Sequence, residues 1–171
     1  NLDRADYNSV FLFRPGVNVI PPEPERYRKM HLVPFTEHFP YRKAFPWVYD
    51  LLVANDTHFW EKGTDVKVFN AAGLSFSSPI CFEDTFGYIS RRFVNAGARA
   101  IVNLTNDAWA ASGPSQWQHM SMAVFRAVEN RVPLVRSTAS GQTCMVDPNG
   151  RVVAMAPAFE EAYLVCRVPV L

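Results

Sequence analysis

The sequence is poor in the features that define several common classes of protein. Its three cysteines, Cys81, Cys144 and Cys166, are too few and too widely spaced for a disulfide scaffold or a zinc site. No apolar run approaches the roughly 20 residues that a membrane-spanning helix needs. The formal net charge is only +1, so no electrostatic feature of the whole chain predicts a nucleic acid as partner.

What is present is the composition of a folded domain. Of the 171 residues, 49% are hydrophobic and 19% are charged, which argues against disorder and permits a buried core. The chain begins with Asn1 rather than Met, and no signal-peptide pattern follows. We therefore expect residues 1–171 to form a single domain, or most of one, in a processed protein or in a piece of a longer one.

Strand and helix signals alternate along the chain. Short apolar or alternating runs predict strands at 10–13, 66–71, 73–80, 99–104, 133–137, 143–146, 152–155 and 163–168. Helical spacing and end signals predict helices at 41–54, 86–95 and 114–130. This order predicts an α/β fold with an open sheet and helices outside it. The short C-terminal strands indicate that two sheets pack face to face.

The sharpest chemical feature is Cys81, within the segment Ser-Pro-Ile-Cys-Phe-Glu-Asp at residues 78–84. It follows an apolar strand and precedes a helix that we expect to start near Thr85. A helix N-terminus lowers the pKa of a thiol and offers backbone N–H groups to an anion. The same position also suits a small core residue, because free cysteines are usually buried and inert. Spacing alone does not choose between nucleophile and core.

A cysteine nucleophile needs partners, and two kinds are available. A Cys–His pair is possible, but no pattern places any histidine near Cys81; the histidines are His31, His38, His58 and His119. Lys29 precedes a short apolar run, and a lysine beside apolar groups can stabilise an oxyanion. A lysine in a loop is nevertheless usually solvated.

Four segments together resemble the nitrilase superfamily. Residues 29–40, Lys-Met-His-Leu-Val-Pro-Phe-x-Glu-x-x-Pro, resemble its lysine segment, and residues 79–83 resemble its nucleophile segment. Residues 103–109 resemble the strand and loop that follow, and residues 118–141 resemble the next helix and strand. Within the superfamily, these segments are most similar to the apolipoprotein N-acyltransferases. One such segment would be weak evidence, but four in order cover nearly the whole chain.

The resemblance implies an α/β nitrilase-like αββα sandwich, here incomplete because its N-terminal strands and helices are missing. It also implies a Glu–Lys–Cys triad in which Cys81 is the nucleophile and Lys29 stabilises the oxyanion. The backbone N–H of Phe82 would be a second oxyanion donor. Glu37 and Glu83 match two further carboxylates of the acyltransferases, which we expect to hold Lys29 and shape the site.

The implied reaction is acyl transfer in two steps. The Cys81 thiolate takes an acyl chain from a phospholipid as a thioester, and the α-amine of a diacylglyceryl-cysteine lipoprotein then attacks it. Trp109 and Ala110 would border the acyl chain. No metal or organic cofactor is needed. The resemblance also implies a place at a bacterial inner membrane, with the catalytic domain on the periplasmic face and membrane segments outside this chain.

The chain departs from the family pattern in one important respect. The general base of the triad is a glutamate well upstream of the lysine, yet only Glu23 and Glu25 precede Lys29, in a Pro-rich loop. We therefore expect a fragment that is inactive alone, with an unpaired sheet edge and exposed apolar surface. Thr36 and Ala110 stand where the pattern has glycine and an aromatic residue.

Two other hypotheses remain open at this stage. A soluble carbon–nitrogen hydrolase, an amidase, would use the same Cys81 and Lys29. A non-catalytic scaffold or binding remnant would explain the missing base. The residues that precede Asn1 discriminate among the three: membrane helices and a glutamate favour the acyltransferase, a glutamate alone favours the amidase, and a start codon favours the remnant.

Overall fold

The structure is a computed structural model that describes residues 5–16, 24–110 and 112–169. Its helices are α1 (Pro46–Ala54), α2 (Gly87–Asn95) and α3 (Gly113–Asn130), with the short 3-10 helix η1 (Cys81–Thr85). Its strands are β1 (Ser9–Leu12), β2 (Glu25–Arg28), β3 (Phe69–Ala71), β4 (Leu74–Ser77), β5 (Ala100–Asn106), β6 (Leu134–Ala139), β7 (Cys144–Val146) and β8 (Val152–Met155).

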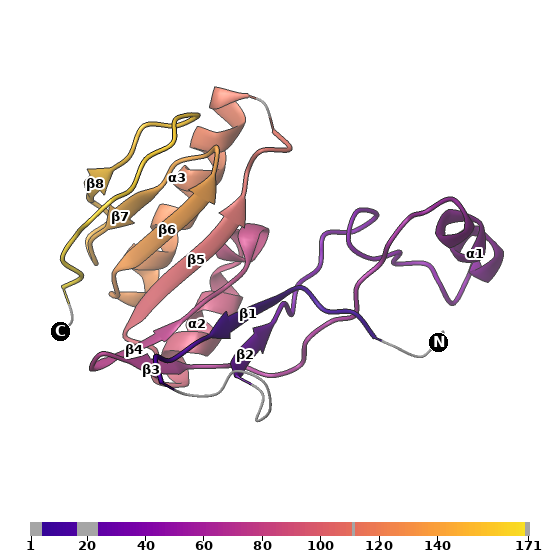
Figure 1. Cartoon of the computed structure of the whole chain (residues 1–171), viewed down its shortest axis with the longest axis horizontal. Coiled ribbons are helices and arrows are strands. Elements are labelled where there is room, and N and C mark those ends of the chain that lie inside the picture. The colour runs from indigo at the N-terminus through magenta and orange to yellow at the C-terminus, as the bar shows by residue number, and fades with distance from the viewer. Residues whose placement is uncertain (1–4, 17–23, 111, 170–171) are drawn as a thin grey trace.

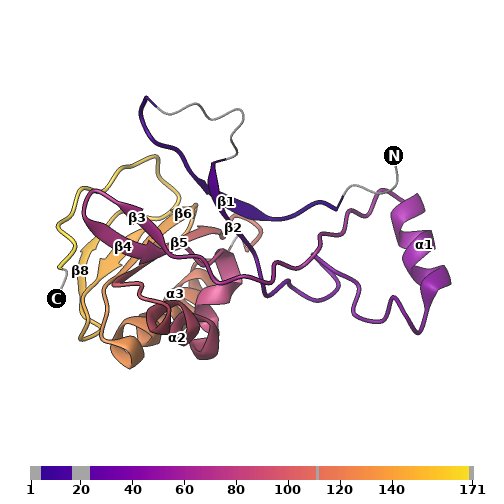
Figure 2. The same ribbon diagram turned by 90° about the horizontal axis from the view of Figure 1, so that it is seen from below.

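One six-stranded sheet forms the centre of the fold, in the order β3-β4-β5-β6-β7-β8 (Figure 1). Strands β4, β5 and β6 are parallel, and the outer pairs are antiparallel. Helices α2 and α3 lie together on one face of this sheet (Figure 2). Because the parallel strands end at the same edge, the segments that follow β4 and β5 meet there.

Two apolar clusters hold the layers together. The first lies between α3 and the sheet, where Ala123 and Ala127 pack on Ile101 and Leu134. Small residues on the helix allow this close approach to the strands. The second joins the antiparallel β1–β2 pair to α2 through Tyr27, whose ring meets Phe93 edge-on at a centroid distance of 5.2 Å.

The segment that carries α1 projects away from the sheet (Figure 1). Pro46 opens α1 at its first turn, where its missing N–H costs no hydrogen bond, as expected. None of the residues of α1 is buried, and Trp47 at its start is 67% exposed. Within the described residues, no helix combines the length and the apolar character needed to cross a membrane.

Most predicted elements are confirmed, with shifts at their ends. The three helices are present, as are the hairpins β3–β4 and β7–β8. The expected strand at 163–168 is wrong: the segment forms no strand, because no neighbouring strand pairs with it, and Tyr163 is 90% exposed. Strand β2 was not predicted, since only Tyr27 among its residues is apolar.

The expectation that the C-terminal strands build a second facing sheet is also wrong. Strands β6, β7 and β8 extend the same sheet as β5. That sheet ends in β3 and β8, and on the face away from the helices Leu104 is 39% exposed. The observed sheet with one helix layer agrees with an incomplete αββα sandwich, and the exposed apolar side chains agree with the expected open surface.

Candidate active site

Cys81 occupies a strained turn at the edge where β4 ends. The turn differs from the expected one, because η1 begins at Cys81 itself and α2 begins only at Gly87. Cys81 has a φ of 51°, in the left-handed region that costs a residue with a Cβ about 1–3 kcal/mol. The Asn103 side-chain amide donates to the carbonyl oxygens of Pro79 (3.2 Å) and Cys81 (3.1 Å), which stabilises the turn.

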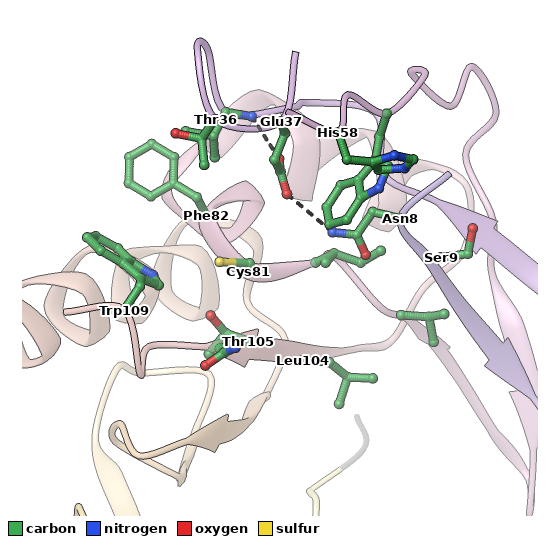
Figure 3. A pocket seen from close by; sticks show the side chains of 15 residues that line it. Asn8, Ser9, Thr36, Glu37, His58, Cys81, Phe82, Leu104, Thr105 and Trp109 are labelled. Atoms are coloured by element: carbon green, nitrogen blue, oxygen red, sulfur yellow. Dashed lines mark hydrogen bonds between the residues drawn. The ribbon is translucent and has the colours of Figure 1, made fainter. Parts of the chain in front are cut away.

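This turn opens into a pocket of about 790 Å³ (Figure 3). The pocket is lined by Asn8, Ser9, Val10, Val33, Thr36, Glu37, His58, Trp60, Ile80, Cys81, Phe82, Leu104, Thr105, Asn106 and Trp109. In Figure 3, the carboxylate of Glu37 points toward Cys81, while Phe82 and Trp109 flank the sulfur on one side. Apolar side chains thus surround a thiol and one carboxylate.

Lys29 and Glu37 form a buried ion pair beside this pocket. The Lys29 side chain is 0% exposed, and its Nζ lies 2.8 Å from Glu37 Oε1. Glu37 also accepts hydrogen bonds from the Asn8 side-chain amide (3.2 Å) and the Val33 N–H (2.8 Å). Because a buried ammonium is tolerated only when it is paired, Glu37 holds Lys29 in place. Lys29 itself does not line the pocket and lies behind Glu37, which does.

Glu83 belongs to the Cys81 turn and does not line the pocket. Its fully buried carboxylate accepts hydrogen bonds from the Tyr27 hydroxyl and from the N–H groups of Met30, His31 and Ile80, all at 2.8–2.9 Å. Burial raises the pKa of Glu83, although these donors oppose the effect. Glu83 therefore connects the Cys81 turn to the segment that follows Lys29.

The remaining sequence-predicted residues fall into two groups. Phe82 and Trp109 line the pocket, and the Phe82 N–H belongs to the first turn of η1, where N–H groups lack helical partners. Ala110 is half-buried and does not line that pocket. Within the described residues, no group of His, Cys, Asp and Glu is arranged to hold a metal ion.

The structure describes one of the two candidate upstream glutamates. Glu25 lies on β2 and makes ion pairs of 2.6 Å with Arg14 and Lys67, away from the pocket lining. Glu23 lies outside the described residues. Among the described residues that line the pocket, Glu37 is the only carboxylate, and Lys29 already engages it.

A buried set of four charged residues behind Cys81 was missed by the sequence reasoning. His119 on α3 lies between Asp84 of η1 and Asp107 after β5, at 2.8 Å from each, and Arg136 of β6 contacts Asp84 at 3.2 Å. Burial lowers the pKa of His119, but the hydrogen bonds to the two carboxylates outweigh it and raise this pKa to about 9. The available signal was limited to two of these residues: His119 lies beside Met120 in α3, and Arg136 follows Leu134 and Val135 in β6.

The raised pKa of His119 predicts a pH-dependent stability. The protonated ring of His119 contributes to the free energy of unfolding. This contribution is fully present below the ordinary histidine pKa of 6.5 and is lost as the pH rises through about 9. We expect the melting temperature of the full-length protein to fall over this interval, and to fall less steeply in the variant His119→Gln. Melting curves between about pH 6 and pH 10 check this, and equal slopes in the two proteins would contradict it.

The comparisons with known proteins agree with this geometry. The family model described as carbon–nitrogen hydrolase matches residues 2–170. The chain belongs to the carbon–nitrogen hydrolase family. The resemblance to the nitrilase superfamily is thereby confirmed. Nit3 of Saccharomyces cerevisiae, a member of the nitrilase superfamily, has the same fold, with a TM-score of 0.63 and 22% sequence identity. The match covers 91% of this chain and 51% of Nit3.

Two relatives of this carbon–nitrogen hydrolase chain are named apolipoprotein N-acyltransferase 1. The Treponema denticola protein is 60% identical over 98% of the chain, and the Treponema pallidum protein is 54% identical over 100% of it. The chain spans only 31% of the length of either relative. The similarity thus concerns the part of those enzymes that matches this chain.

Proposed function

We propose that residues 1–171 form part of a single catalytic domain and supply the Cys–Lys centre of an apolipoprotein N-acyltransferase. The observation that carries the proposal is the pocket lined by both Cys81 and Glu37, whose carboxylate points toward Cys81 and pairs with the buried Lys29. The 60% identity to a protein named apolipoprotein N-acyltransferase 1 supports the same assignment. The full-length protein is the unit to which this activity belongs.

In the first step, Cys81 attacks the ester carbonyl of a phospholipid acyl chain. The Sγ–carbon bond forms and the ester carbon–oxygen bond breaks, so that a lysophospholipid leaves with the thiol proton. A base from outside the described residues carries this proton, because the one described carboxylate in the pocket is paired with Lys29. Lys29 Nζ and the Phe82 N–H stabilise the oxyanion of the tetrahedral intermediate.

In the second step, the α-amine of a diacylglyceryl-cysteine lipoprotein attacks the thioester. The nitrogen–carbon bond forms, the carbon–sulfur bond breaks, and the amine proton returns to sulfur through the same base. Two sequential substrates at one sulfur predict ping-pong kinetics. The backbone strain at Cys81 keeps its side chain at the pocket, where both substrates can reach it.

The surroundings of Cys81 suit lipid substrates. Most of the surface that lines the pocket is apolar, and the Trp109 ring at its wall is 76% exposed, as a contact surface for an acyl chain requires. The projecting segment with α1 adds exposed aromatic side chains, among them Phe45 (48%) and Trp47 (67%). These features support contact with a lipid surface. The bacterial inner membrane and its periplasmic face are the part of this proposal that rests on the resemblance to the acyltransferases.

The test is a two-substrate assay on the full-length protein in phospholipid vesicles of one defined acyl chain. With a diacylglyceryl-modified peptide as acceptor, we expect the peptide to gain that acyl chain on its α-amine, with parallel double-reciprocal plots. Hydrolysis of small amides without transfer would instead indicate an amidase. The absence of both reactions would favour the non-catalytic hypothesis. The ion pairs of Glu25 support that hypothesis, because a glutamate engaged by two cations is not free to act as the missing base.

Glu37→Gln is expected to slow acyl transfer by about 10- to 100-fold, a range typical of residues that orient a catalytic group. The amide keeps the size of the side chain but leaves Lys29 buried without its counter-charge. Glu61→Gln is the matched control, because that carboxylate is 55% exposed. Initial rates of product formation check the prediction, and equal rates in the two variants would contradict it.

A further inference from the structure

Four buried charged residues, here called the charge cluster, take no part in either step of the proposed reaction. Asp84, Asp107, His119 and Arg136 are each less than one-tenth exposed. They come from four different elements, namely η1, the loop after β5, α3 and β6. His119 makes the shortest contacts within the cluster. Arg136 adds two more, at 3.2 Å from Asp84 and 3.7 Å from Asp107.

The charges of this cluster balance when His119 is protonated. Asp84 and Asp107 supply two negative charges, and Arg136 and the imidazolium supply two positive ones. His119 holds its proton at neutral pH, since its pKa is raised to about 9. Loss of one member would leave an uncompensated buried charge, which is strongly unfavourable in a protein interior.

The cluster touches both sides of the pocket wall. Asp84 belongs to the same short helix as Cys81, and the ring of Phe82 lies 5.9 Å from the ring of His119. Asp107 begins the loop that carries Trp109, and it accepts a hydrogen bond of 3.4 Å from Thr105, which lines the pocket. His119 therefore bonds at 2.8 Å to both the Cys81 turn and the Trp109 loop, and Arg136 reaches the same two carboxylates at 3.2 and 3.7 Å.

Gly141 adds a second constraint at Asp107. A Cβ at Gly141 would collide with Asp107 Oδ2, so the loop after β6 packs directly against this carboxylate. The Asp107 N–H also donates to the Ala139 carbonyl at 3.2 Å. Asp107 is thus held by the Gly141 loop and by Ala139, so its hydrogen bond with His119 connects α3 to a fixed carboxylate.

We infer that His119 is a positioning residue: its imidazolium ties the Cys81 turn to the Trp109 loop and neutralises the carboxylates beneath the thiolate. This inference rests on the proposed role of Cys81 as nucleophile. Without the imidazolium, one carboxylate of the cluster is uncompensated, and Asp84 stands in the same short helix as Cys81. A nearby negative charge disfavours a thiolate, so the Cys81 thiol then ionises at higher pH and attacks more slowly.

The experiment measures how fast iodoacetamide alkylates Cys81 in the full-length protein as a function of pH, with peptide mapping to separate Cys81 from other thiols. In His119→Gln, we expect the midpoint of the profile to rise by about one pH unit and kcat to fall about tenfold at little change in KM. Gln118→Ala, on the exposed face of the same helix, is the control and should match the wild type.

The double variant His119→Gln/Asp107→Asn separates charge from fold, because it removes one charge of each sign. We expect its alkylation midpoint to return to the wild-type value, although two buried side chains have changed. An unchanged midpoint in His119→Gln, or a double variant that stays shifted, would overturn the inference. If His119→Gln does not fold, Asp107→Asn alone decides: a midpoint above the wild-type value would contradict the charge argument.

The outcome is distinguishable from failure of the proposed function. If the wild type forms no acyl-enzyme but the alkylation midpoint still shifts in His119→Gln, the charge cluster acts on Cys81 and the acyltransferase assignment is wrong. If the acyl-enzyme forms and the midpoint does not shift, the acyltransferase assignment stands and His119 is only structural.

Discussion

Replacing Cys81 with alanine is expected to reduce N-acylation of a diacylglyceryl peptide by the full-length protein to background. The reason is chemical: alanine has no atom that can carry the acyl chain, and no other described residue that lines the pocket is a thiol. Loss of a covalent nucleophile typically costs on the order of 10⁴-fold or more in kcat. The measurement is the rate at which the acceptor peptide gains one acyl chain, followed by mass spectrometry.

The matched control for Cys81→Ala is Cys166→Ala. Cys166 is a free, half-buried thiol near the C-terminal end of the described residues, and it does not line the pocket. The same substitution at Cys166 should leave the rate near that of the wild type. Wild-type rates in Cys81→Ala, with the variant shown to be folded by its melting curve, would exclude Cys81 as the nucleophile.

Replacing Lys29 with methionine is the second substitution for which we expect a large effect. Methionine keeps much of the apolar length of lysine but removes the cation that we propose stabilises the oxyanion. Loss of one oxyanion donor lowers kcat by about 10²- to 10³-fold. Lys62→Met is the control, because Lys62 is exposed, whereas Lys29 is buried and paired with the pocket residue Glu37. Steady-state rates with both substrates check the prediction.

Removal of Lys29 also leaves Glu37 without its counter-charge, so folding and catalysis must be separated. The double variant Lys29→Met/Glu37→Gln removes both charges of the pair and should recover much of the melting temperature that Lys29→Met loses. We expect its kcat to stay low, because the oxyanion donor is still missing. Recovery of kcat together with stability would show that Lys29 is structural rather than catalytic.

The fold was largely predictable because its elements carry local signals. Helix α3 follows from apolar side chains at helical spacing, and the β7–β8 hairpin follows from the turn residues between two apolar runs. The strand expected at 163–168 shows the limit of such reasoning. An alternating run forms a strand only where a neighbouring strand supplies hydrogen-bond partners, and a local pattern does not contain that information.

The site was less accessible to sequence reasoning. Local context left Cys81 undecided between core and nucleophile, and Lys29 was identified only through the resemblance to a family. The ion pair of Lys29 with Glu37 agrees with the expected holding role. The charge cluster was missed because Asp84 and His119 lie 35 residues apart in sequence and meet only when η1 and α3 pack together.

One measurement tests the central claim most directly. The full-length protein is mixed with vesicles of a phospholipid of one defined acyl chain, without acceptor, then digested and mapped by mass spectrometry. The account predicts a single acyl increment on the peptide that contains Cys81, which hydroxylamine removes and the acceptor peptide discharges. An unmodified Cys81 peptide, in a preparation that nevertheless acylates the acceptor, would contradict the account.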